Sequence, residues 1–234
     1  MCVIAIMAVV AAFIAPAFTS LKSAGDVTSA AYTIKGVLDQ GRTYAIANNT
    51  YTWVGFYEED ASQSSTSPAT PGIGRVVLSI VASSDGTKVY STAVSPATTI
   101  DPTKLTQVIK LTKIDGVHLK VFPTGSGTGT TFDTRPAFSA GNSQIGDTEP
   151  PNPSLTPIQF PVGNPAPTAQ YTFTKALQFA PNGQVRIDND NYTLKRVLEI
   201  GLQPCHGTTP DVNNPNVAAI QIAGVSANVK IFKK

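Results

Sequence analysis

The segment Met1–Leu21, MCVIAIMAVVAAFIAPAFTSL, contains no charged side chain, and Lys22 is the first charge in the chain. A helix needs about 20 predominantly apolar residues to cross a bilayer. The segment is therefore long enough to span a membrane as a helix. Pro16 interrupts it, because proline removes one backbone hydrogen bond and can kink a helix.

Three interpretations of this segment compete. A cleaved secretory signal carries basic residues before its apolar core and ends in a small-residue cleavage site. Here nothing basic precedes the apolar run, and Ala15-Pro16-Ala17 has proline in its middle position. A plain transmembrane anchor is the second interpretation. The third, a helix that continues beyond the membrane, depends on the residues that follow.

After Lys22 the sequence continues with helical periodicity. Apolar residues recur at steps of three, four and seven, with polar residues on the other face, as in an amphipathic helix. Glycines at 25, 36 and 41 weaken this helix, so packing must support it. The apolar stripe is expected to dock on a globular head, and it consists of Val27, Ala31, Ile34, Leu38 and Ala45.

The simplest prediction joins the two stretches into one continuous helix from near Met1 to about Asn48. Its first half would be apolar all round and its second half amphipathic. The apolar half could then sit in a membrane and later pack against identical helices in a filament core. The residues expected in this membrane and filament-core part are Val3, Ile4, Ile6, Val9, Val10, Phe13, Ile14, Pro16 and Phe18.

Strand signals dominate from Tyr51 onward. Tyr51–Tyr57 is rich in the aromatic and β-branched residues that strands prefer. The Asp85-Gly86 pair indicates a hairpin between Arg75–Ala82 and Lys88–Val94. Further expected strands are Val117–Phe122, Leu177–Ala180, Gln184–Ile187 (after a Pro-Asn-Gly turn), Leu194–Leu202 (a strand or a short helix), Ala218–Ile222 and Asn228–Phe232.

Two stretches between these strands are expected to be exposed loops, Glu58–Gly74 and Pro123–Thr168. The second has eight prolines between Pro136 and Pro167 and cannot pair in the middle of a sheet. It does not divide the chain, because neither side has enough strands for its own core. The predicted fold class is therefore α+β, with a long helix (residues 1–48) packed on one antiparallel β-sheet or sandwich head (residues 49–234).

Composition narrows the function classes. Only 14% of the residues are charged, against about 25% in ordinary soluble domains, and Gly and Pro number 18 each. This mixture favours a β-rich, loop-rich extracytoplasmic protein. The net charge of +2 is small and its basic residues are scattered, so no nucleic-acid partner is expected.

The chain offers few groups for chemistry. Cys2 and Cys205 are not expected to pair, because Cys2 lies in the apolar segment. His118 falls on the polar face of a predicted strand, and a single histidine cannot make a metal site that needs three or four ligands. Cys205-His206 has no second ligand pair and is expected in a loop turn.

Asp188, Asp190 and Glu199 occupy positions 1, 3 and 12 of a calcium-loop pattern, but Thr193 replaces the glycine of position 6. They are weak calcium candidates, and a solvated turn is the favoured interpretation. Gly125–Thr131 has neither the lysine nor the following helix of a phosphate-binding loop. With no Gly-x-Ser-x-Gly elbow and no clear triad, we expect neither an enzyme nor a cofactor or small-molecule substrate.

Four stretches together resemble type IV pilins and pseudopilins, in particular the H-type minor pseudopilins and pilin-like cassette proteins. The resemblance implies a structural subunit of a bacterial filament, anchored in the inner membrane before assembly and then periplasmic or extracellular. Its partners would be copies of itself and other pilin-like subunits. The stretches are VIAIMAVVAAFIAPAF (Val3–Phe18), LDQGRTYAIANNTYTWVGF (Leu38–Phe56), LQFAPNGQVRI (Leu177–Ile187) and AAIQIAGVSANVKIFKK (Ala218–Lys234).

The sequence also departs from that family. A basic leader ending in Gly, then Phe, with Glu a few residues on, is the family's processing signature, and it does not occur here. No residue is therefore nominated for cleavage or methylation. Some pseudopilins are stabilised by calcium, which is what the resemblance adds to the weak calcium candidates. The alternative function is a membrane-anchored or secreted β-sandwich module for binding or adhesion.

Overall fold

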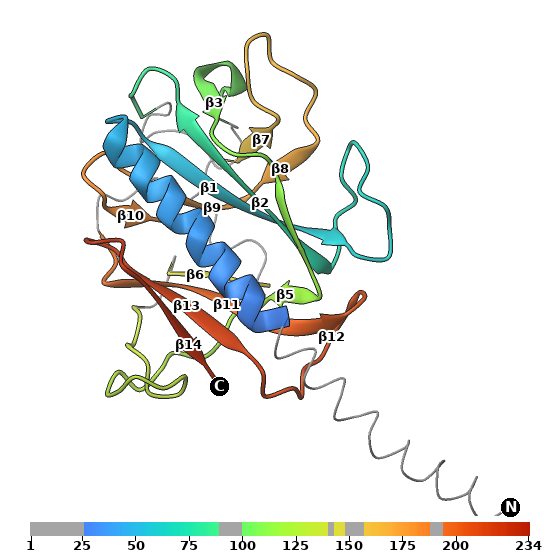
Figure 1. Ribbon diagram of the computed structural model, residues 1–234, viewed down its shortest axis with the longest axis vertical. Helices are drawn as coiled ribbons and strands as arrows, with labels where there is room; N and C mark the ends of the chain where they lie inside the picture. The colour runs from blue at the N-terminus through green and yellow to red at the C-terminus, as the bar shows by residue number, and fades with distance from the viewer. Residues whose placement is uncertain (1–25, 89–99, 140–142, 148–156, 188–193) are drawn as a thin grey trace, which may run out of the picture.

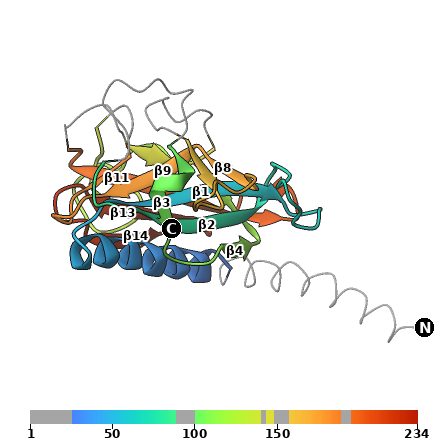
Figure 2. The same cartoon turned by 90° about the horizontal axis from the view of Figure 1, so that it is seen from above.

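The computed structural model describes residues 26–88, 100–139, 143–147, 157–187 and 194–234 (Figure 1). This part of the chain is mostly β, with 38% of residues in strands and 14% in helix. It contains one α-helix, residues 26–47, two six-stranded sheets and one two-stranded sheet. The helix lies across one side of the two large sheets, which Figure 2 shows from above.

The predicted α+β fold class with a long helix is wrong. The helix has about 22 residues, and several antiparallel sheets make up the rest of the described chain. The prediction overweighted the helical periodicity, whereas the chain after Tyr51 contains many short segments rich in aromatic and β-branched residues, which favour strands. Within the described ranges no helix is long and apolar enough to cross a membrane. The residues Val3 to Phe18 of the expected apolar half lie outside these ranges.

The first large sheet is centred on β1 (Thr52–Asp60). It pairs antiparallel with β2 (Gly74–Ser83) on one side and β9 (Lys175–Phe179) on the other. The sheet is completed by β10 (Val185–Arg186) beside β9 and, beside β2, by β3 (Leu105–Gln107) and β4 (Thr112–Asp115), with the 3-10 helix η1 (Pro102–Lys104) before β3. The predicted hairpin around Pro181-Asn182-Gly183 is confirmed, because β9 and β10 pair across it.

The second large sheet is built around β11 (Val197–His206). This segment is a strand and not the short helix that the sequence also allowed. The predicted closing hairpin is confirmed, since β13 (Ala218–Ala223) pairs antiparallel with β14 (Val229–Lys233). The remaining strands of this sheet are β5 (Val117–Leu119), β6 (Gln144–Ile145) and β12 (Thr209–Pro210), and a separate pair is formed by β7 (Ile158–Phe160) and β8 (Tyr171–Phe173).

The stretch 123–168 is not the unpaired surface insertion that its prolines predict. Strands β6 and β7 both lie inside it, and Ile145 and Ile158 are at most 1% exposed. Short apolar segments between the prolines are enough for two or three ladder pairs at the edges of a sheet. Parts of the stretch therefore belong to the core.

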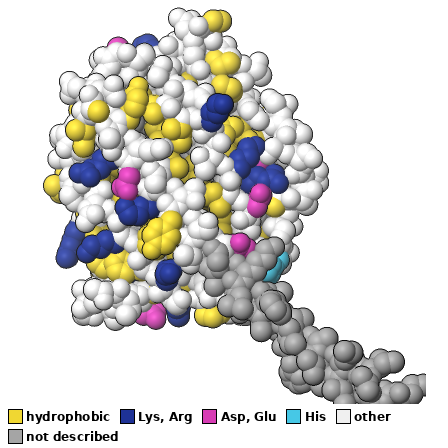
Figure 3. All heavy atoms as spheres, viewed as in Figure 1, with side chains coloured by type: hydrophobic (Ala, Val, Ile, Leu, Met, Phe, Trp, Pro, Cys, Tyr) yellow, Lys and Arg dark blue, Asp and Glu magenta, His cyan; other side chains and the backbone are white. Residues whose placement is uncertain are grey.

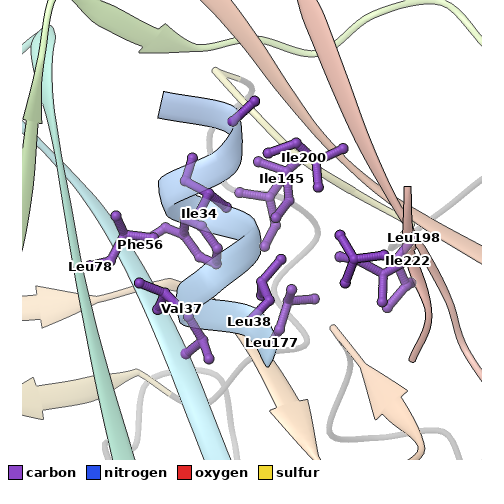
Figure 4. Close-up of a cluster of buried hydrophobic side chains, with 14 of the residues drawn as sticks. Ile34, Val37, Leu38, Phe56, Leu78, Ile145, Leu177, Leu198, Ile200 and Ile222 are labelled. Carbon is purple, nitrogen blue, oxygen red and sulfur yellow. The ribbon is translucent and has the colours of Figure 1, made fainter. Parts of the chain in front are cut away.

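The main hydrophobic core lies between the helix and both large sheets. Ile34 and Leu38 point from the helix toward Phe56 and Leu78 of the first sheet and Ile200 of the second (Figure 4). Burying each of these side chains stabilises the fold by about 1.5–3 kcal/mol. The five residues of the expected docking stripe are at most 2% exposed: Val27, Ala31, Ile34, Leu38 and Ala45.

The helix ends in a Schellman motif. Asn49 is left-handed, with φ of 49°, and the Thr50 N–H donates to the Ala45 carbonyl at 3.0 Å. The Asn49 N–H donates to the Ile46 carbonyl at 3.4 Å. These bonds satisfy carbonyls that a helix end would otherwise leave without partners. The chain is thereby turned directly into β1.

Candidate functional site

The outward face of the helix 26–47 carries few charged residues. Its most exposed residues are uncharged, and the side chain of Asp39 lies among them at 47% exposure. Exposed helix faces in soluble proteins usually carry charged residues. We call this face the outer stripe, and it consists of Ser29, Tyr32, Thr33, Gly36, Gln40, Thr43, Ile46 and Ala47.

Two hydroxyl groups of the outer stripe are turned back into the helix. The Thr33 hydroxyl donates to the Ser29 carbonyl at 2.9 Å, and the Thr43 hydroxyl donates to the Asp39 carbonyl at 2.8 Å. Such bonds to the carbonyl four residues earlier satisfy the hydroxyl within the helix. The threonines therefore present methyl groups to the outside. With Tyr32 and Ile46 exposed by 60% and 47%, the stripe is more apolar than its composition suggests.

Gly36 lies in the middle of the outer stripe, where the fold itself does not need a glycine. A Cβ placed there would have no atom within 4 Å. Glycine inside a helix costs about 1 kcal/mol relative to alanine. Gly36 therefore lowers the stability of the helix without improving the packing of the head.

Two charged side chains lie beside or within the stripe and pair with each other. Lys35 and Asp39 form an ion pair of 2.7 Å one helical turn apart, and their side chains are 35% and 47% exposed. Figure 3 shows this side of the molecule, with basic and acidic side chains in small groups around scattered hydrophobic side chains. Because Lys35 and Asp39 pair with each other, a helix packed on the stripe would leave neither of these two charges buried and unpaired.

Of the three expected calcium candidates, the structure describes Glu199. Asp188 and Asp190 lie outside the described residues. Glu199 is 1% exposed and accepts hydrogen bonds from Arg135 Nε at 2.6 Å and Arg135 Nη2 at 2.9 Å. Gln221 Nε2 donates to the same carboxylate at 2.8 Å. Glu199 therefore has a structural role, and no group of three His, Cys, Asp or Glu side chains within the described part of the chain could hold a metal ion.

The sequence predicts His118 on the polar face of a half-buried strand, but the strand is buried on both faces. All three residues of β5 are buried, and the His118 side chain lies 2.9 Å through Nδ1 from Glu58 Oε1. Cys205 is not in a loop turn either, because it lies in β11 and is 5% exposed. Burial, with a smaller effect from Glu58, raises the pKa of the Cys205 thiol to about 11. Cys2, which was not expected to form a disulfide with Cys205, lies outside the described residues.

The buried carboxylate of Glu59 was not expected from the sequence, which predicted an exposed loop from Glu58 to Gly74. Strand β1 continues to Asp60, and Glu59 is 2% exposed. Its carboxylate accepts hydrogen bonds from Ser65 and Tyr171 and pairs with Arg75 and Lys113, each at 3.3 Å. Burial alone would raise the pKa of Glu59, but these bonds and charges outweigh it and lower that pKa below its ordinary value.

Comparisons with known proteins assign no family to this chain. The chain matches no protein-family model, no curated protein and no solved structure.

Proposed function

We propose that this chain is a structural subunit of a filament of the type IV pilus or type II secretion pseudopilus kind. The apolar segment Met1–Leu21 would hold it in the inner membrane before assembly. The outer stripe would then face other pilin-like subunits, including copies of the same chain, in a periplasmic or extracellular filament. In this role the protein is not an enzyme and needs no cofactor.

The observation that carries the proposal is the outer stripe, whose residues are uncharged and whose nearest charges, Lys35 and Asp39, pair with each other. The inner side of the helix already supplies the core of the head, so the outer side has no role in folding the monomer. Its threonine hydroxyls are satisfied inside the helix, and Gly36 lets another backbone approach closely. Helices that pack closely use small residues where their backbones approach.

The sequence on either side of the stripe supports the same role. The charge-free segment Met1–Leu21 precedes the helix by only a few residues. A membrane segment next to a helix with an uncharged outer side suits a subunit that leaves the bilayer and packs laterally. An isolated binding module gains nothing from an uncharged helix face. The alternative function, a β-sandwich module for binding or adhesion, therefore ranks second.

Negative-stain electron microscopy with immunogold labelling tests the proposal. The full chain is expressed in a bacterium that has a type IV pilus assembly system, and surface material is sheared off and purified. Filaments labelled along their length by an antibody against the head are expected. Monodisperse labelled particles, with no filaments in the sheared fraction, would contradict the proposal and favour the binding module.

A further inference from the structure

A cavity of about 430 Å³ with a mixed polar and apolar lining opens where the two large sheets meet, apart from the outer stripe. Its volume falls within the range of roughly 300–1,000 Å³ typical of small-molecule sites. Residues of β1, β5 and the turn between β8 and β9 contribute to its wall, and Asp147 closes one side. The polar lining consists of Tyr57, Glu58, His118, Asp147, Thr174 and Lys175.

Glu58 and His118 form the centre of this cavity. Glu58 Oε1 accepts the Leu119 N–H at 3.1 Å and lies 2.9 Å from His118 Nδ1. The two side chains are only 10% and 7% exposed. Within the described chain, Glu58 Oε2 and His118 Nε2 have no hydrogen-bond partner. Neither atom is among the buried atoms that lack a partner, so both are open to the cavity and available to an incoming polar ligand.

The chemistry of the pair selects hydroxyl groups. With Nδ1–H donated to the carboxylate, neutral His118 presents Nε2 as an acceptor, and protonated His118 presents it as a donor. A hydroxyl group both donates and accepts, so it can pair with Nε2 in either state. Glu58 Oε2 accepts from a second hydroxyl group. A ligand with two neighbouring hydroxyls fits both atoms at once.

The remaining charges in the cavity favour a ligand without net charge. Asp147 accepts hydrogen bonds from Lys120 Nζ at 2.6 Å and from the Val121 N–H at 2.8 Å. Burial opposes ionisation of Asp147, but these bonds outweigh it and lower its pKa, so this carboxylate is charged and already paired. Glu58 shares the wall with Lys175, and Asp147 pairs with Lys120, so these four formal charges sum to zero.

The walls of the cavity supply an apolar surface beside the polar groups. Tyr57 is held edge-on against Tyr171, with ring centroids 5.3 Å apart, and Pro71 and Ile73 complete the lining. Sugar rings combine hydroxyl edges with apolar C–H faces. We propose that this cavity binds a neutral sugar residue, with Glu58 and His118 holding two neighbouring hydroxyl groups. The site does not depend on whether the chain assembles into filaments.

Saturation-transfer NMR on the full chain tests this proposal. The protein is kept in a detergent without a sugar headgroup, and methyl glycosides of glucose, galactose and N-acetylglucosamine are added at millimolar concentration. We expect saturation transfer to at least one glycoside. Glu58→Gln should reduce this signal at least fivefold, because Oε2 loses its charge, and Thr174→Ala at the exposed rim should reduce it about twofold.

The controls separate binding from folding. Thr130→Ala, on an exposed loop that does not line the cavity, should bind like the wild type. If a thermal melt shows that Glu58→Gln is unfolded at the temperature of the binding measurement, Tyr57→Phe and Thr174→Ala provide the test of binding, since both keep the packing. Absence of transfer to all three glycosides would overturn the proposal. So would equal signals in the wild type and in every folded cavity variant, or transfer to acetate or ethylammonium in place of the sugars.

Discussion

Val54 of β1 packs against Gly41 of the helix so closely that a Cβ at Gly41 would lie 2.9 Å from Val54 Cγ2. Gly36, five residues earlier on the opposite side of the same helix, would meet no atom within 4 Å. The first glycine is required by the core of the head. The second is not, which makes the two positions a matched pair for experiment.

We expect Gly41→Ala and Gly36→Ala to change stability in opposite directions. Overpacking against Val54 should destabilise the head by about 1–3 kcal/mol, partly offset by the better helix propensity of alanine. Gly36→Ala should stabilise it by about 0.5–1 kcal/mol. Thermal denaturation of the two variants checks both. A loss of stability in Gly36→Ala would show that the fold does use this glycine.

Arg135→Met should be among the most destabilising substitutions in the chain. Arg135 is 1% exposed, binds Glu199 through two nitrogens and donates to the Phe132 carbonyl at 2.6 Å. Removing it leaves the Glu199 carboxylate buried with only Gln221, at a cost of about 3–5 kcal/mol. Urea denaturation measures this cost. The double variant Arg135→Met/Glu199→Met should recover part of it, whereas equal losses in both would argue against a buried charge as the cause.

Glu59 should make the head less stable in acid. Its pKa in the folded protein lies below the ordinary value of 4.5, so its contribution is complete above that value. The contribution is lost as the pH falls through the lower folded pKa. The melting temperature should therefore fall less between neutral pH and the lowest pH at which the protein folds in Glu59→Gln than in the wild type. Parallel curves below the ordinary pKa would contradict the role of this carboxylate.

Cys205 should be an unreactive thiol in the folded head. Its pKa of about 11 leaves almost no thiolate at pH 8, and the thiol donates to the Gly207 carbonyl at 3.1 Å. In a Cys2→Ser variant, a thiol reagent such as DTNB should react slowly in buffer and rapidly in urea. Rapid reaction in buffer would show that the thiol is accessible.

Local patterns in the sequence were enough to predict several elements. The stripe from Val27 to Ala45 has the period of a helix and is buried, and the Pro181-Asn182-Gly183 turn does join two strands. The predicted fold class was wrong, because the described chain has one α-helix of about 22 residues and is otherwise mostly β.

Contacts between distant residues were beyond such patterns. Arg135 and Glu199 are 64 positions apart, and Glu58 and His118 are 60 apart. Nothing near either residue in the sequence indicates its partner. The strands β6 and β7 are three residues or shorter, and prolines surround them, so their pairing depends on the sheet they join and not on their own propensity. The buried charges could have been suspected only from an arginine and a glutamate within otherwise apolar or small segments.

The outer stripe is the central element of this account, and Gly36→Leu tests it most directly. A leucine at this exposed helical position has open space around it, so the head should keep or slightly raise its melting temperature. The matched control is Thr130→Leu on an exposed loop away from the helix. The measurement is the number of labelled filaments in the sheared fraction. We predict at least a tenfold loss for Gly36→Leu and none for Thr130→Leu; wild-type numbers of filaments with Gly36→Leu would contradict the assembly role of the stripe.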